Sequence, residues 1–350
     1  MNDTATDERF NLTSSPGFAA WLQTTGASVA FTTRQSGRLF FVGLGPDDKP
    51  MIFKRNFPGC TGLGLSVNGA RLALATHHQL LRFDRLSLRA GAAGHDAIFT
   101  PRVAWITGDV AAHDVVMPPD GRPIFVNTAY SCVAQVSDGF SFRPLWRPPF
   151  ISRLAPEDRC HLNGLALRDG RPRYVTLSAP SDDAGGWRQG RAEGGLLMDM
   201  ETNETLLAGL SMPGSPRMHD GRLWLLNSGA GQLGWFDEAA RGFQVVAFCA
   251  GYARGLALIG PYALVGVSMA RGVSGFKGLP LERTLSGRGA EPRCGLLVID
   301  TRSGETIEWI RMEGGVREIH DVAVLPGVRN PVAIGLMTDE VQRLITIDDG

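Results

Sequence analysis

A short pattern recurs about every fifty residues along this chain, which is the spacing of a repeat protein. Each copy has a small or polar residue, two or three alternating apolar residues, a turn that contains glycine, and a second apolar run. The copies begin near Cys60, His113, Asn163, Ser215, Arg254 and His320. Repeats of about 40–50 residues built from short strands are typical of a β-propeller, in which each copy forms one blade.

The turns and the chain ends indicate how many blades there are. The turns read VNGA, PDGR, RDGR, HDGR, IGPY and PGVR, and Asn-Gly and Asp-Gly favour tight hairpins. The copy from His320 is short, so we expect N-terminal strands to complete it and close the ring. Three N-terminal runs are available (SVAFTT, RLFFVGL and PMIFKRNF), which leaves a seventh blade as an alternative. The predicted fold class is all-β, a six-bladed β-propeller.

The N-terminal segment is expected to differ from the rest. Residues 1–15 are polar and predict a loose tail, whereas Phe18–Thr25 has helical apolar spacing and is followed by Gly26, a typical C-cap. We expect this short helix to cover one end of the propeller. The predicted domains are therefore a tail and short helix over 1–27 and a single propeller over 28–350, closed by N- and C-terminal strands.

Composition excludes several classes of partner. The chain is 43% hydrophobic and 20% charged, with a formal net charge of zero, unlike the basic surface of a nucleic-acid-binding protein. No apolar run reaches the ~18–20 residues of a membrane helix, and the N-terminus does not resemble a signal peptide. The five cysteines include no CxxC pair. We expect a cytoplasmic protein with reduced thiols and neither nucleic-acid nor membrane partners.

The repeat brings distant residues together at the axis. Each copy starts where its innermost strand enters the central channel, so His113, Asn163, Arg254 and His320 occupy equivalent positions. Residues two apart on a strand share a face, which adds His161 beside Asn163 and Glu318 beside His320.

These residue types point to a metal. Neutral imidazole binds Fe, Zn or Cu, and three histidines with an open position are typical of catalytic metal centres. We expect His113, His161 and His320 to be ligands, with Asn163 as a fourth ligand or a substrate contact. Asp114 and Asp321 directly follow two of these histidines, and they either orient the imidazoles or face neighbouring strands.

Two charged residues are the candidate catalytic groups. Glu318 is the expected general base for a metal-bound water. Arg254 either binds an anionic substrate group or pairs with Glu318. Cys160 should point away from the channel, because it precedes His161, and His219 is expected in a turn.

Two long insertions interrupt the repeat, at residues 178–194 and 270–293. Both fall between a second and a third strand and should project from one face, as a partial lid or as mobile loops. Each carries an aromatic residue, Trp187 or Phe276, and several arginines.

The segment HLNGLAL, His161–Leu167, resembles the calcium-dependent phosphotriesterase superfamily of propellers, which includes gluconolactonase/regucalcin-like and strictosidine synthase-like proteins. The resemblance implies that Asn163 faces an axial metal, with Ca²⁺ as the alternative ion. The chain departs from that pattern by offering His113 and His320 where those families use asparagine and acidic ligands. Segments along nearly the whole chain, such as HDVVMPPDGRPIFVNTAYSC and REIHDVAVLPG, resemble a bacterial family of conserved hypothetical propellers, which implies no activity.

The leading hypothesis is a metal-dependent enzyme, a hydrolase or a lyase/oxygenase, acting on a small or peptide-like substrate. The alternative is a non-enzymatic propeller that binds a protein or a small ligand through one face, since the fold alone implies no activity.

Overall fold

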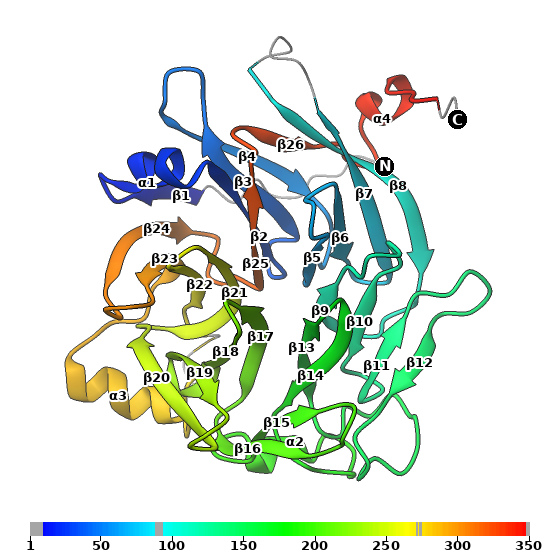
Figure 1. The fold of residues 1–350 in the computed structure, drawn as a ribbon, viewed down its shortest axis with the longest axis vertical. Coiled ribbons are helices and arrows are strands. Elements are labelled where there is room, and N and C mark those ends of the chain that lie inside the picture. The colour runs from blue at the N-terminus through cyan, green and yellow to red at the C-terminus, as the bar shows by residue number, and fades with distance from the viewer. Residues whose placement is uncertain (1–9, 88–93, 271, 273–274, 348–350) are drawn as a thin grey trace.

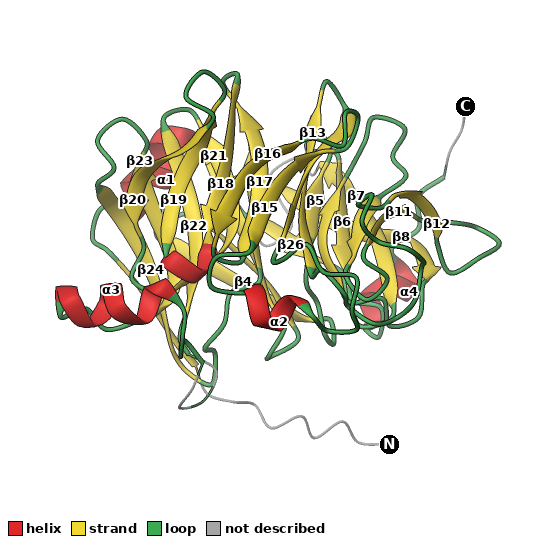
Figure 2. Cartoon of the chain, turned by 90° about the horizontal axis from the view of Figure 1, so that it is seen from below, coloured by secondary structure: helices red, strands yellow, loops and turns green. Residues whose placement is uncertain are grey.

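The computed structural model describes residues 10–87, 94–270, 272 and 275–347. Its strands form six sheets, arranged as blades around a central channel (Figure 1, along the channel; Figure 2, from the side). The predicted six-bladed propeller is confirmed, and the alternative of a seventh blade is wrong for the described part of the chain.

In three of the four blades that have four strands, the strands run in sequence order from the channel outward. Blade 3 contains β9 (Ala112–Val116), β10 (Ile124–Asn127), β11 (Cys132–Gln135) and β12 (Arg143–Trp146). Blade 4 contains β13 (Leu162–Arg168), β14 (Arg171–Leu177), β15 (Gly195–Asp199) and β16 (Thr205–Leu210). Blade 5 contains β17 (Pro213–His219), β18 (Arg222–Asn227), β19 (Gln232–Asp237) and β20 (Gly242–Phe248).

The other three blades each take in a strand from near a chain end. Blade 1 contains, from the channel outward, β25 (Asp321–Pro326), β2 (Ala27–Thr33), β3 (Arg38–Leu44) and β4 (Pro50–Asn56). Blade 2 contains β5 (Leu63–Leu65), β6 (Arg71–Ala75), β7 (Gln79–Ser87), β8 (Ala97–Ile106) and β26 (Pro331–Ala333). Blade 6 contains β21 (Tyr252–Ile259), β22 (Tyr262–Ser268), β23 (Cys294–Asp300), β24 (Thr306–Gly314) and β1 (Phe10–Ser14).

The glycine of each repeat turn ends the innermost strand of its blade. In five copies the chain returns as a hairpin, whereas after Gly327 it leaves blade 1 and forms β26 in blade 2. All six adopt a left-handed backbone with φ between 51° and 75°, namely Gly69, Gly121, Gly170, Gly221, Gly260 and Gly327. Glycine enters this region without the steric cost that a Cβ atom imposes. Each turn therefore ends the innermost strand of its blade at a defined residue.

Both chain ends contribute to closing the ring. The C-terminal strand β25 pairs antiparallel with β2, and Val324 lies opposite Val29. Strands β2 and β3 are buried along their whole length. The polar segment that we expected to be loose is partly ordered, because residues 10–14 form β1 and pair with β24. The leading residues 1–9 lie outside the described part of the chain.

The N-terminal helix α1 has the predicted bounds, Phe18–Thr25, and ends at Gly26 in a left-handed conformation. Its position differs from the expectation. It buries Phe18, Trp21 and Leu22 against strands β2, β3 and β24, and so packs between two blades instead of covering a mouth of the channel. An isolated helix of eight residues is too short to be stable in water, so packing against the strands stabilises α1.

The remaining helical segments are α2 (Trp187–Gly190), η1 (Ser228–Ala230), α3 (Pro280–Arg288) and α4 (Asp339–Arg343). Across the described residues, no helix combines the length and the apolar character needed to span a bilayer.

An ion cluster in the channel connects the inner strands. Arg217 of β17 donates hydrogen bonds to both oxygens of Asp114 on β9, from Nη1 at 2.9 Å and Nη2 at 3.0 Å. Its Nη2 lies 3.5 Å from Oδ1 of Asp321 on β25. The carboxylates also reach the next blade, because Asp114 accepts from the Leu165 amide and Asp321 from the Leu63 amide. Five inner strands are therefore held at fixed distances.

We expect Arg217→Met to lower the free energy of unfolding by about 3–5 kcal/mol, because it leaves Asp114 and Asp321 buried without their cation. Only 4% and 3% of these side chains are exposed. Urea unfolding at neutral pH measures the change. The matched control is Arg302→Met, whose surface pair with Asp300 should be worth less than about 1 kcal/mol. Equal losses in the two variants would contradict a structural role for the cluster.

Candidate functional site

A pocket of about 450 Å³ opens where the inner strands begin. We call it the axial pocket, and residues of blades 1, 3, 4, 5 and 6 line it. The structure brings every predicted site residue into its lining: His113, His161, Asn163, Arg254, Glu318 and His320. The volume lies in the usual range for small-molecule sites.

Two of the three histidines are buried, and all three rings are close together. The ring centroid of His113 lies 5.0 Å from that of His161 and 5.5 Å from that of His320. The Nε2 of His320 is 3.1 Å from the backbone oxygen of His113 and donates a hydrogen bond to it. This bond crosses from blade 1 to blade 3 and fixes the orientation of the His320 ring.

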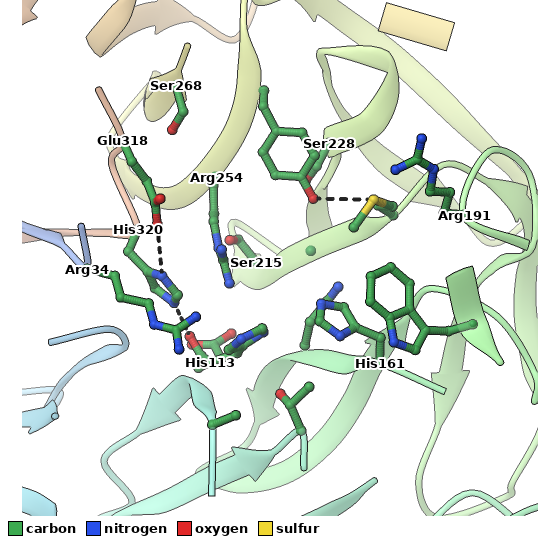
Figure 3. A pocket seen from close by; sticks show the side chains of 18 of the residues that line it. Arg34, His113, His161, Arg191, Ser215, Ser228, Arg254, Ser268, Glu318 and His320 are labelled. Carbon is green, nitrogen blue, oxygen red and sulfur yellow. Dashed lines mark hydrogen bonds and ion pairs between the residues drawn. The ribbon is translucent and has the colours of Figure 1, made fainter. Parts of the chain in front are cut away.

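The two buried rings are uncharged at neutral pH. Burial, followed by the charge of Arg254, holds the pKa of His113 well below its usual value. Burial and then Arg254 also lower the pKa of His320 to about 3, although Glu318 acts in the opposite direction. In Figure 3 a dashed line joins His320 to Glu318, whose Oε1 lies 3.8 Å from Nδ1.

His161 is held differently, by a carboxylate and an aromatic ring. Its Nδ1 lies 3.0 Å from Oδ2 of Asp158, which also accepts a 2.9 Å hydrogen bond from Nε1 of Trp187. The Trp187 ring stacks on the imidazole with centroids 4.1 Å apart. Because the carboxylate accepts from Nδ1, the proton resides there, and Nε2 becomes the nitrogen that can accept a proton from a ligand.

Left-handed backbone is concentrated around the axial pocket. His161 has φ of 51° and Asp158 has φ of 44°, and Ala111, Met212 and Ser215, which also line the pocket, have φ between 45° and 51°. Such conformations cost about 1–3 kcal/mol each in residues with a Cβ, and they cluster at functional sites. In the fourth copy of the repeat, this conformation turns Ser215 into the pocket, near where the sequence placed it.

Two arginines face the buried histidines. The side chains of Arg34 and Arg254 point toward His113 and His320 in Figure 3. Arg254 is followed by Gly255, whose φ of 77° and close approach to the Val322 amide exclude a side chain. A Cβ there would lie 2.7 Å from that nitrogen. The glycine therefore lets β21 approach β25 closely enough to place Arg254 beside His320.

The roles left open for Asp114 and Asp321 are now decided. They do not orient the imidazoles but face neighbouring strands, where they bind Arg217 and backbone amides. His113 and His320 directly precede these aspartates, and all four residues contribute to the lining of the pocket, with the carboxylates bound to Arg217 and to backbone amides. In the first copy, Thr61 occupies the repeat position of His113 and His320. It donates a hydrogen bond to the Ala112 carbonyl of blade 3 and so connects two neighbouring blades.

Of two smaller expectations, the one for Cys160 is confirmed and the one for His219 is wrong by one residue, because His219 still belongs to a strand. Cys160 lies in the core between blades 3 and 4, away from the channel, as predicted. His219 ends β17 directly before the turn, and its Nε2 donates a 2.8 Å hydrogen bond to the Gly260 carbonyl of blade 6.

The predicted ligands are not arranged as a metal-binding site. Among the described residues, no group of three or more His, Cys, Asp or Glu side chains is arranged to hold a metal ion. Nε2 of His320 and Nδ1 of His161 already have partners, and Oδ1 of Asn163 accepts a 2.9 Å hydrogen bond from Thr176. The Fe, Zn or Cu site, and the Ca²⁺ alternative, stay predictions.

The two insertions meet over the axial pocket. Trp187 from the first and Phe276 from the second both line it, so the loops project from one face as expected. Nη2 of Arg191 donates to the backbone oxygen of Lys277, which joins the loops directly. Residues 271 and 273–274 of the second insertion lie outside the described part of the chain.

Sequence reasoning missed Asp158 and Arg34. Asp158 lies in an irregular segment before β13, and its only sequence signal is the spacing of three residues from His161. Arg34 belongs to the hairpin between β2 and β3, outside the repeat position that we aligned.

Comparison with known proteins identifies a family and a fold. Residues 16–334 match a family model described as "Domain of unknown function (DUF4915)". The sequence matches no curated protein. A chain of the nidogen/laminin complex is similar in structure, with TM-score 0.54 and 11% identity over 86% of this chain and 99% of that chain. A protein of unknown function from Bacteroides caccae has TM-score 0.50 and 11% identity over 85% and 98%. At such identities the likeness shows the fold alone.

The five cysteines should not react with thiol reagents in the native protein. All are buried and unpaired by disulfides, and burial raises the pKa of each thiol to about 12. Because the thiolate is the reactive form, we expect no modification by Ellman's reagent at pH 8 without denaturant, and full modification in guanidinium chloride. Rapid native modification of one cysteine would contradict this expectation.

Proposed function

This chain belongs to the DUF4915 family, and we propose that it is an enzyme that moves a proton on a small anionic substrate in the axial pocket. His161 is the general base, Asp158 orients it, and Arg34 and Arg254 bind the anionic group. The setting we propose is the bacterial cytoplasm, which fits five free cysteines.

The observation that carries the proposal is the arrangement of His161. An imidazole whose Nδ1 is fixed by a carboxylate 3.0 Å away, and whose face is fixed by Trp187, presents Nε2 in a defined direction. The Asp158 carboxylate stabilises the imidazolium that forms when Nε2 takes a proton. The strained backbone at both residues supports a catalytic role over a merely structural one.

The arginines supply the second half of the chemistry. A carboxylate placed between Arg34 and Arg254 would bring the neighbouring carbon toward the imidazoles. When His161 removes a proton from that carbon, the electron pair moves toward the carboxylate, and the guanidinium groups stabilise the charge. In an isomerisation, the imidazolium would then return the proton to another carbon. In an elimination, the electron pair would form a C=C bond as a hydroxyl group leaves the adjacent carbon, and the imidazolium would protonate that hydroxyl so that it departs as water.

A metal-dependent enzyme is the second candidate, and one observation favours it. Among the described residues, the buried Nδ1 atom of His113 has no hydrogen-bond partner, and that of His320 has only Glu318 Oε1 at 3.8 Å. Buried polar atoms are usually paired, so an unpaired imidazole nitrogen suits a ligand or a metal. In this version Glu318 would be the general base and Asn163 a further ligand.

We expect His161→Asn to abolish turnover without unfolding the protein. Asparagine tolerates the left-handed backbone at this position but provides no base at neutral pH. Incubation with pools of small carboxylic acids, followed by mass spectrometry, would show compounds that the native protein consumes. The variant should consume them at least about 100-fold more slowly, and Asp158→Asn should also be slowed.

The matched control is His219→Asn, which removes a histidine at the opposite mouth of the channel. It should retain the native rate. Equal rates for the native protein and the His161 variant would overturn the assignment of the base. A protein that binds carboxylates but consumes none would favour the non-enzymatic alternative.

Metal content separates the two candidates. In the metal-dependent version, the purified protein without a tag should hold Fe, Zn or Cu by elemental mass spectrometry, and the double variant His113→Ala/His320→Ala should lose it. Bound Ca²⁺ would instead favour a calcium site like the one that the resemblance to gluconolactonase-like propellers implies. Full turnover by protein that binds none of these ions, even after reconstitution, would eliminate this candidate and leave the acid–base enzyme.

A further inference from the structure

The charges around the axial pocket do not balance. Among the described residues that line it, four are arginines and four are carboxylates, listed here together: Arg34, Arg188, Arg191, Arg254, Asp114, Asp158, Glu318 and Asp321. Asp114 and Asp321 already share Arg217, which reaches them from the other side. Apart from these two ion-paired aspartates, the lining carries four guanidinium groups and two carboxylates, those of Asp158 and Glu318.

The arginines come from two parts of the chain. Arg34 and Arg254 lie at the inner end, beside the buried histidines, and come from the hairpins and strands of the propeller itself. Arg188 and Arg191 come from the first insertion, and Figure 3 shows Arg191 on the opposite side of the pocket from Arg34. We call the first two arginines the inner pair and the last two the outer pair.

Among the described residues, the contacts of the outer pair are to uncharged groups. The Arg188 guanidinium lies 4.8 Å from the Trp187 ring centroid and donates to the Gly185 carbonyl. Arg191 donates to the Lys277 carbonyl. None of these contacts neutralises a charge, so either guanidinium would gain from an anionic partner.

The lining also includes apolar side chains. Met212, Tyr252, Phe276 and Leu279 line the axial pocket, and they come from blades 5 and 6 and the second insertion. Such walls suit a hydrocarbon or aromatic body, and the few charged groups fix its orientation.

We propose that the substrate carries two carboxylates at opposite ends of an apolar body, one held by Arg34 and Arg254 and the other by Arg188 and Arg191. This inference rests on the proposed function, because it names the substrate class of the same pocket. It adds that recognition is shared between the rigid propeller and the inserted loops.

Binding of straight-chain dicarboxylates tests the inference. Isothermal titration at low salt would compare the acids of five to nine carbons with their monomethyl esters, which keep the length but lose one charge. At the best length, the dicarboxylate should bind at least about tenfold more tightly than its ester. Arg191→Met should remove this advantage and leave binding of the ester unchanged, whereas Arg34→Met should weaken both.

The matched control is Arg288→Met, because this arginine of α3 stacks on Phe248, outside the residues that line the pocket. It should bind all ligands as the native protein does. Equal binding of dicarboxylates and esters at every length, or no binding of either, would overturn the inference. So would tight binding of inorganic phosphate with no gain from a second carboxylate.

The two proposals fail in different ways. His161→Asn should keep the preference for dicarboxylates while losing turnover. If the native protein prefers dicarboxylates but converts none, the enzyme proposal fails and the charge assignment stands. If it converts monocarboxylates with no gain from a second charge, the enzyme proposal stands and this inference fails.

Discussion

The contact between Arg217, Asp114 and Asp321 sets the geometry on which the axial pocket depends. A propeller closes only if its inner strands approach one another at equal distances, and each carboxylate here accepts an amide of the next blade while sharing one guanidinium. Burying three charges is costly, and this set is tolerated because each charge has both a partner and hydrogen bonds. The same strands carry His113 and His320 one residue earlier, so holding the aspartates also positions the imidazoles.

The repeat explains how much of this the sequence could predict. Six copies with a glycine turn were enough to predict the number of blades, because position in the repeat determines where each inner strand lies. His161 and Glu318 line the same pocket as His113 and His320, as predicted, but neither lies in a strand, so alternation along a strand is not the reason. His161 directly precedes β13 in a left-handed conformation, and Glu318 precedes β25. The bounds of α1 were also predictable from apolar spacing and Gly26, but its packing partners were not, because they depend on strands distant in sequence.

The features that escaped prediction lie where the backbone is irregular. Asp158 reaches His161 because both residues adopt left-handed conformations, which no period in the sequence reveals. Asp114 and Asp321 had two possible directions, and only the position of Arg217 on another blade decides between them. The polar segment at residues 10–14 pairs with β24 although its composition indicates a loose tail, since an open outer edge of a sheet can recruit any extended strand.

The axial pocket therefore combines two kinds of support. Its inner end rests on strands that are buried, hydrogen-bonded across blades and held by the ion cluster, which suits a site where imidazole and guanidinium groups must keep their relative positions. Its outer end rests on two insertions that are joined through Arg191 and Lys277. Trp187 connects the two, because it belongs to an insertion yet stacks on His161 and donates to Asp158. In the proposed function, a movement of that insertion would therefore change the orientation of the His161 ring through this one side chain.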